Sequence, residues 1–130
     1  MNLESPKMTV KKDDKTVFNF LTNVENFEQL MPENTEKFEA TEDSFLFALK
    51  GMPDIRLKLQ ESNANNNIVL ASTSDKFPFT LVGNIVKLDE ASSEVQLIFD
   101  GQFNAMMAMM IKNPIQKFIN TLAENIEKKV

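Results

Sequence analysis

The side chains that most often carry out proton transfer, nucleophilic attack and metal binding are missing from this sequence. It contains no histidine and no cysteine. Their absence excludes Cys–His and Ser–His–Asp nucleophilic centres and zinc sites built on histidine or cysteine. Histidine is also the side chain best suited to general acid–base catalysis near neutral pH. Any chemistry would therefore depend on carboxylates, lysines or the single arginine.

The single arginine, Arg56, could clamp a carboxylate through two parallel hydrogen bonds. It alternates with Ile55 and Leu57, so on a strand it lies on the opposite, wet face, which favours a surface role. The same argument places Glu94 and Asp100 outward. The three glycines are scattered, so the sequence has no phosphate-cradling loop. We predict no catalytic residue, no metal site, no cofactor and no enzymatic activity.

The run from Met106 to Met110 is the most unusual local feature, with four methionines in five positions. Methionine is flexible and polarisable, so it adapts to ligands of varied shape. The run spans more than one helical turn, and its methionines cannot all point inward. Three interpretations stay open. Met107 and Met110 could fill the core, the outward methionines could form a partner or homodimer surface, or the run could gate a ligand cavity.

Length and charge limit the classes of partner. The chain has 130 residues, which fits a single domain over residues 1–130. Its 42% hydrophobic and 25% charged residues are the balance of a soluble globular protein. The net charge of −5 repels phosphate backbones. Lys11-Lys12 and Lys128-Lys129 are isolated pairs, and we therefore expect no nucleic-acid partner.

Targeting and membrane signals are not evident. The first residues, MNLESPKMTV, lack an apolar stretch of signal-peptide length. No segment approaches the roughly 18 uninterrupted apolar residues of a membrane span. The lack of cysteine also excludes a disulfide framework. We expect a cytoplasmic protein.

Apolar periodicity predicts a strand, two short helices and then six strands. The first strand is expected over Leu3–Lys11, interrupted by Pro6, which suggests an edge or a bulge. Helices are expected over 14–22 and 24–31, with Asp13 or Asp14 as the first N-cap. Alternation begins at Thr35, and the further strands include segments 45–49, 55–60, 68–74, 79–88 and 94–103. Their short links require antiparallel pairing.

Everything after Asn104 is predicted to be one helix of about 25 residues, nearly 40 Å long. One face carries apolar residues at steps of three or four: Met107, Ile111, Ile115, Phe118, Leu122 and Ile126. Pro114 cannot donate to the helical ladder, so we expect a kink near residues 110–114. The fold class is therefore α+β, with a curved antiparallel sheet of about seven strands closed by the long C-terminal helix.

This order of elements resembles the helix-grip fold of the START-like (SRPBCC) superfamily, which includes birch-pollen-allergen proteins, polyketide cyclases and aromatases, and coenzyme Q-binding proteins. The likeness to small uncharacterised bacterial members covers essentially the whole chain. It is carried by four segments: LTNVENFEQLMP (21–32), KGMPDI (50–55), SDKFPFTL (74–81) and GQFNAMMAMMIKNPIQKFINTLAENI (101–126).

The resemblance implies a cavity for an apolar ligand between the sheet and the long helix. The residues expected to line it are Phe45, Phe47, Leu57, Leu59, Phe79, Leu81, Leu97, Phe99, Met107, Met110, Ile111, Phe118 and Leu122. Taken one at a time, the phenylalanines are equally typical of a packed core. The polar pocket residues of cyclases and aromatases have no evident counterparts here.

The function expected from the sequence is non-catalytic binding or transport of a small hydrophobic molecule, such as a lipid, an isoprenoid or a polyketide-like compound. One alternative is a protein-interaction module with a filled core and a methionine-rich surface. A second is an enzyme of the cyclase or dehydratase type, which would need an inward acid or base.

Overall fold

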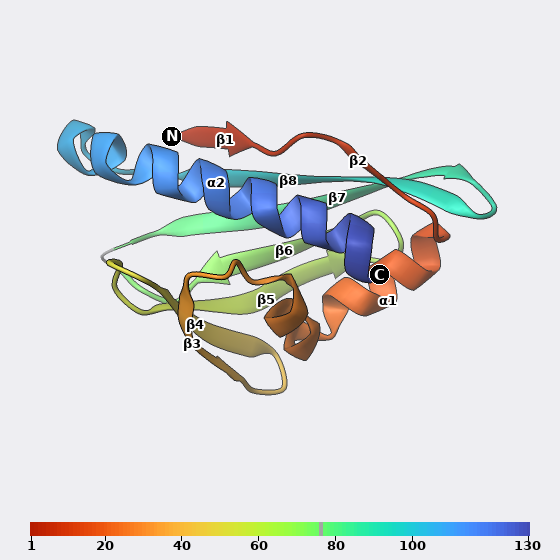
Figure 1. Cartoon of the computed structure of the whole chain (residues 1–130), viewed down its shortest axis with the longest axis horizontal. Helices are drawn as coiled ribbons and strands as arrows, with labels where there is room; N and C mark the ends of the chain where they lie inside the picture. The colour runs from red at the N-terminus through yellow and green to blue at the C-terminus, as the bar shows by residue number, and fades with distance from the viewer. Residues whose placement is uncertain (76) are drawn as a thin grey trace.

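A computed structural model shows a curved antiparallel sheet with a long C-terminal helix, α2, lying across it (Figure 1). The structure describes residues 1–75 and 77–130. The strands are β1 (Asn2–Glu4), β2 (Met8–Val10), β3 (Thr35–Ala40), β4 (Ser44–Leu49), β5 (Ile55–Asn63), β6 (Asn67–Ser72), β7 (Phe79–Asp89) and β8 (Ser92–Gly101). The helices are α1 (Asp14–Thr22), η1 (Val24–Leu30) and α2 (Ala105–Lys129).

The sheet confirms the predicted α+β helix-grip class. Its eight strands follow the order β1-β8-β7-β6-β5-β4-β3, and β2 also pairs with β8. The six strands expected from Thr35 onward are β3 to β8, and each pairs antiparallel with its neighbour in sequence. Short links leave no other arrangement, because parallel neighbours need a long crossover.

The N-terminal segment forms two short strands, where the sequence predicted one interrupted by Pro6. Proline has no N–H to donate to the ladder, and the chain leaves β8 at this point. The buried Ser5 replaces the missing ladder contact, since its hydroxyl accepts the N–H of Leu97 at 2.9 Å and donates to the carbonyl of Pro6 at 2.9 Å. The pairing with β8 therefore resumes at Met8.

The two predicted short helices are present, but the second is a 3₁₀ helix. α1 begins after Asp13, whose carboxylate accepts the N–H of Thr16 at 3.1 Å. Hydrogen bonds from the side chain of Thr16 and from this N–H lower the pKa of Asp13. In η1 the buried residues Val24, Phe27 and Leu30 recur every three positions. That spacing matches the three residues per turn of a 3₁₀ helix, so all three side chains face the interior.

α2 presents the predicted apolar face to the sheet. Its N-cap is Asn104, whose side chain accepts the N–H of Met107 at 2.8 Å. Along the expected face Met107 is half-buried, and the residues from Ile111 to Ile126 are buried. The chain stays helical through Pro114, and the missing N–H leaves the carbonyl of Met110 without its helical donor. The kink expected there stays a prediction.

Phenylalanine rings fill much of the space between the sheet and α2. In one group, the ring of Phe45 lies 4.9 Å from Phe27 and 5.9 Å from Phe47 between centroids, and Phe47 stacks on Phe118 at 4.9 Å. The rings join η1, β4 and α2 into one packed unit. A second group contains Phe79, Phe99 and Phe103, with the first two 4.8 Å apart.

Candidate functional site

A cavity of about 570 Å³ lies between the middle of α2 and the two loops that follow η1 and β4. This volume is within the range of about 300–1,000 Å³ that is typical of small-molecule sites. The residues that line it are Pro32, Asn34, Leu49, Lys50, Gly51, Met52, Asn113, Pro114, Lys117, Phe118 and Thr121. This cavity is the α2 groove.

A tight turn holds the loop wall of the α2 groove. The N–H of Met52 donates to the carbonyl of Leu49 at 2.9 Å, which closes a four-residue turn. Gly51, third in the turn, has a φ of 81°, in the left-handed region where glycine carries no steric penalty. The N–H of Lys50 donates to the carbonyl of Asn34 at 2.9 Å and ties the turn to the loop after η1.

The helix wall of the α2 groove consists of two rows of side chains. Asn113, Lys117 and Thr121 recur at steps of four and form a polar row. Pro114 and Phe118, also four apart, form an apolar row beside it. Because residues four apart lie one above the other on a helix, each row faces the groove continuously. The helix wall of the groove is therefore polar along one row and apolar along the other.

The charges that line the α2 groove have one sign. Lys50 and Lys117 line it, and its described lining contains no Asp or Glu. Asp54, close to Lys50 in sequence, instead pairs with Lys37 at 3.5 Å. Over residues 1–75 and 77–130, neither lysine amine of the groove takes part in an ion pair or a side-chain hydrogen bond.

A second, wholly apolar pocket lies next to the α2 groove, and Met52 lines both. Its volume is about 10 Å³, which is room for one water molecule at most. The residues around it are Met52, Pro53, Ile55, Phe77, Phe79, Phe99, Phe103, Ile111 and Ile115. The aromatic region where the sequence predicted a cavity is thus almost closed by its own side chains.

The residues predicted to line a cavity occupy four kinds of position. Six are packed in the core at 2% exposure or less: Phe45, Phe47, Leu57, Leu81, Leu97 and Leu122. Phe79, Phe99 and Ile111 surround the small apolar pocket. Leu59 and Met107 are half-buried. Phe118 lines the α2 groove.

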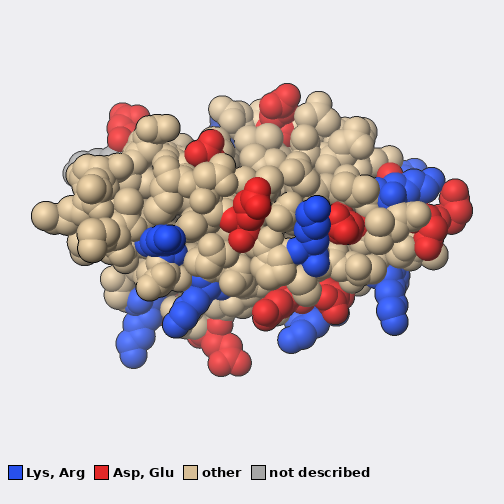
Figure 2. All heavy atoms as spheres, turned by 90° about the horizontal axis from the view of Figure 1, so that it is seen from above, with Lys and Arg blue, Asp and Glu red and all other residues tan. Residues whose placement is uncertain are grey.

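Met110 occupies a different position, and its interpretation as core or cavity lining is wrong. Its side chain is 69% exposed, because Ile111, one residue later, takes the inward position after Met107. Met106 and Met109 are 75% and 83% exposed. No charged residue occurs between Gly101 and Ile111. The end of the molecule where α2 begins accordingly shows few charged side chains on the face in Figure 2.

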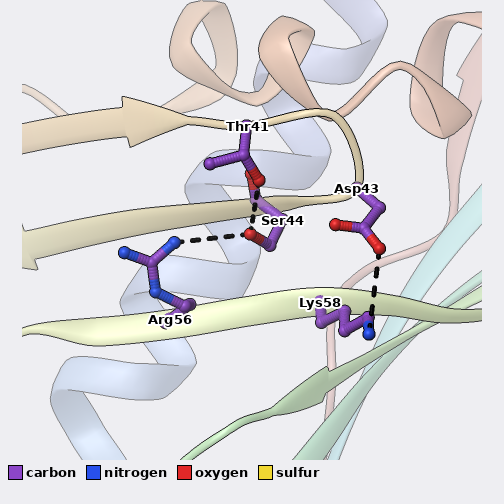
Figure 3. A network of polar contacts seen from close by, with 5 residues as sticks. All are labelled: Thr41, Asp43, Ser44, Arg56 and Lys58. Atoms are coloured by element: carbon purple, nitrogen blue, oxygen red, sulfur yellow. Dashed lines mark hydrogen bonds and ion pairs between the residues drawn. The ribbon is translucent and has the colours of Figure 1, made fainter.

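Arg56 lies outside the α2 groove. Its guanidinium donates to the hydroxyl of Ser44 at 3.3 Å, and that hydroxyl contacts the hydroxyl of Thr41 at 2.7 Å (Figure 3). Beside them Asp43 and Lys58 form an ion pair at 3.8 Å. Arg56 therefore ties neighbouring strands together, in agreement with the surface role predicted from its alternation.

No Asp, Glu, Lys or Arg side chain among the described residues is buried. The buried polar residues are all serines: Ser5, Ser44 and Ser93. No buried side-chain nitrogen or oxygen among the described residues lacks a hydrogen-bond partner. Within the same residues, no three His, Cys, Asp or Glu side chains are grouped as a metal site requires. No helix described is both long and apolar enough to cross a membrane.

Sequence reasoning missed most of the α2 groove, including both of its lysines. Lys50 lies in a turn and Lys117 on the polar side of α2, positions that by themselves carry no signal of a binding site in the sequence. The available signal was the step-four row of Asn113, Lys117 and Thr121 beside Pro114. Its meaning depends on the turn at Gly51 lying opposite, which is a tertiary contact that periodicity does not reveal.

Comparison with known proteins shows the fold. No model of a known protein family matches the sequence, and no curated protein matches it. Among solved structures, the protein XoxI from Bacillus cereus is similar at a TM-score of 0.76 and 10% identity, over 98% of this chain and 93% of that one. A START superfamily protein from Mycobacterium smegmatis has a TM-score of 0.72 and 15% identity, over 99% and 96%.

The norcoclaurine synthase of Thalictrum flavum is also similar, with a TM-score of 0.76 and 10% identity over 98% of this chain and 84% of that one. That synthase has been solved in complex with dopamine and hydroxybenzaldehyde. At these identities the likeness extends to the backbone fold alone. The chain has the START-like fold that its sequence resembled.

Proposed function

We propose that this protein, with its START-like helix-grip fold, binds a small molecule with a largely apolar body and does not transform it. The observation that carries the proposal is the α2 groove, with its volume of about 570 Å³ and its apolar floor of Leu49, Met52 and Phe118. A lipid, an isoprenoid or a polyketide-like compound has the required character. The cytoplasmic location expected from the sequence belongs to the same proposal.

The proposed site differs from the one expected from the sequence. The ring groups of Phe45 and Phe99 fill the space between sheet and helix, so the open volume lies at the side of α2. Burial of apolar ligand surface on the groove floor stabilises a complex by roughly 25 cal/mol per Å² before the costs of ordering. Affinity would therefore come mainly from the apolar body of the ligand.

The non-catalytic part of the proposal rests on the kinds of side chain present. General acid–base catalysis needs a titratable group held near the reacting atoms, and burial is the usual means of tuning its pKa. The described buried polar residues are serines, and the two lysines of the α2 groove are exposed. A cyclase or dehydratase would need a buried acid or base, and the described lining of this groove contains no Asp, Glu or buried Lys.

Methyl NMR of methionine tests the proposal directly. Of the eight methionines, Met52 lines the α2 groove, whereas Met106, Met109 and Met110 are exposed on the first turns of α2. The protein, labelled at its methionine methyl groups, is titrated with organic extracts of its host cells, and native mass spectrometry identifies what copurifies. A ligand in the groove shifts the Met52 resonance.

A filled groove provides the control. Asn113→Phe places a ring on the lining of the α2 groove, whereas Met109→Phe adds the same ring at an exposed position of the same helix. We expect the first variant to lose binding and the second to retain it. Equal binding by both variants, or no Met52 shift with any extract or copurified compound, would contradict the proposal.

The exposed methionines favour a second candidate function, a contact with another copy of this chain. Met106, Met109 and Met110 are each more than two-thirds exposed and have no charged neighbour in sequence before Lys112. Stable interfaces bury about 800 Å² per partner, more than three side chains supply, so this contact would be transient. Sedimentation velocity over a concentration series tests it. Substitution of all three by Gln should abolish any dimer, and an unchanged profile would contradict the contact.

A further inference from the structure

We propose that the ligand of the α2 groove is an amphiphile with an anionic head group, above all a carboxylate, that binds between the amines of Lys50 and Lys117. This inference rests on the proposed function and adds the chemical class of the ligand. A neutral lipid or isoprenoid would make no use of the two lysines. A fatty-acid-like or other carboxylated apolar molecule would use both the lysines and the apolar floor.

The polar lining of the α2 groove is suited to an anion. It consists of two lysines, two asparagines and a threonine, and it contains no acidic residue. Lysine supplies donors only, and asparagine and threonine each add a donor. The described lining thus carries two positive charges and no negative one, in a chain whose net charge is −5. The charge of this lining is positive, whereas the net charge of the whole protein is negative.

Lys50 and Lys117 differ from the three lysines for which the described residues form an ion pair. Lys37, Lys58 and Lys87 each have a carboxylate within 4 Å. Lys50 and Lys117 have no such partner among the described residues, although Asp54 follows Lys50 closely in sequence. Two like charges on one groove repel each other. An anion bound between them would remove that repulsion and add charge-assisted hydrogen bonds.

The backbone holds the two lysines on opposite walls. Lys50 is the second residue of the turn closed by Leu49 and Met52, and its own N–H is bonded to Asn34. Lys117 is the middle residue of the polar row on α2. Neither backbone position needs to be ordered when a ligand arrives, which lowers the cost of binding.

The apolar floor gives the ligand a direction. Met52 borders the α2 groove on one side and the small aromatic pocket on the other. The lining therefore continues from the lysines past the flexible side chain of Met52 toward Phe79 and Phe99. Methionine changes rotamer at little cost, so a longer tail can extend past Met52 into this region.

A matched pair of probes separates the head group from the tail. Octanoate and octan-1-ol share an eight-carbon chain, and only the first is charged at a pH well above the pKa of a carboxylic acid. We expect both to shift the Met52 methyl resonance and octanoate to bind about tenfold more tightly, which is the size of two partly exposed ion pairs. The preference should fall as salt rises, because ions screen exposed charges.

Charge-neutral variants locate the effect. Lys50→Gln and Lys117→Gln should each weaken octanoate binding about three- to fivefold, leave octan-1-ol unchanged, and together remove the preference. Lys112→Gln changes the net charge of the protein equally, on the same helix, but lies outside the groove lining. It should leave both affinities unchanged. Circular dichroism before titration confirms that each variant is folded.

Each outcome has a distinct meaning. Preferential octanoate binding that depends on Lys50 and Lys117 supports the inference. Equal binding of the two probes at Met52, unaffected by the lysine variants, overturns the anionic head and leaves ligand binding standing. If neither probe shifts the Met52 resonance, the α2 groove is not the binding site, and both the proposed function and this inference are overturned. If Lys112→Gln loses as much octanoate affinity as Lys117→Gln, the lysines act through the net charge of the protein, and a direct contact with the head group is overturned.

Discussion

The stacked rings of Phe47 and Phe118 give a sharp test of whether the interior is packed or open. Their centroids are 4.9 Å apart and their planes differ by 9°, and the side chains are only 1% and 5% exposed. Substituting leucine at both positions, singly and together, removes the stacked pair but keeps an apolar side chain. A double-mutant cycle then isolates the energy of the pair from the energy of burial.

The expected magnitudes follow from burial and ring geometry. Phenylalanine-to-alanine changes in cores cost about 3–5 kcal/mol, and leucine retains most of the apolar surface, so each single variant should lose about 1–2 kcal/mol of unfolding free energy. Stacked pairs contribute about 0.5–1.5 kcal/mol beyond area. The double variant should therefore lose less than the sum of the single losses by about that amount.

Urea unfolding followed by far-ultraviolet circular dichroism measures these values, since the chain has no tryptophan or tyrosine for fluorescence. With a urea slope of about 1–3 kcal/mol per M, a loss of about 1.5 kcal/mol lowers the midpoint by about 0.5–1.5 M. Phe47 and Phe99, which belong to separate ring groups, should give additive losses within about 0.5 kcal/mol. If the Phe47–Phe118 cycle is equally additive, the interior is not the stacked unit described above.

Three further perturbations test other parts of the fold. The pKa of Asp13 is lowered in the folded state, so its carboxylate contributes fully to the unfolding free energy above the pKa of the unfolded chain and loses this contribution as pH falls through the folded-state pKa. Asp13→Asn should therefore flatten the fall in unfolding free energy below about pH 4. An unchanged pH profile would argue against the cap. Ser5→Ala leaves the buried N–H of Leu97 without an acceptor and should cost about 1–3 kcal/mol in urea unfolding; a loss near zero would contradict that bond. Gly101→Ala would place a Cβ 2.9 Å from the Cβ of Phe79 and should cost about 1–3 kcal/mol in the same assay, whereas wild-type stability would show that the strand gives way.

Local patterns predicted most of the secondary structure. The strict alternation of Ile55, Arg56 and Leu57 indicated a strand with one wet face, and the structure places a strand there with Arg56 between two buried neighbours. The steps of three and four from Ile111 to Ile126 indicated the buried face of α2. Such patterns are reliable because one period fixes which side chains share a face.

The parts that failed depend on contacts between distant segments. Pro6 signalled an interruption, but the two separate pairings with β8 also need the hydroxyl of Ser5 beside Leu97. Whether a cavity stays open between the sheet and α2 depends on how closely the rings of Phe118 and Phe47 pack. Alternation along a strand predicts the direction of a side chain but not the space left beside it. The α2 groove was therefore not predicted, although each of its segments was.

The pairing of both N-terminal strands with β8 has a consequence for synthesis. Asn2 pairs with Asp100 and Met8 with Val95, so the first strands made wait for the last one. Until β8 has been made, β1 and β2 have no partner, and α2 follows β8 in the chain to cover the apolar face. Contacts so distant in sequence delay folding to milliseconds or longer. Until α2 has been made, the phenylalanines of β4, β7 and β8 are not covered by the helix, and transiently exposed apolar surface of this kind promotes aggregation.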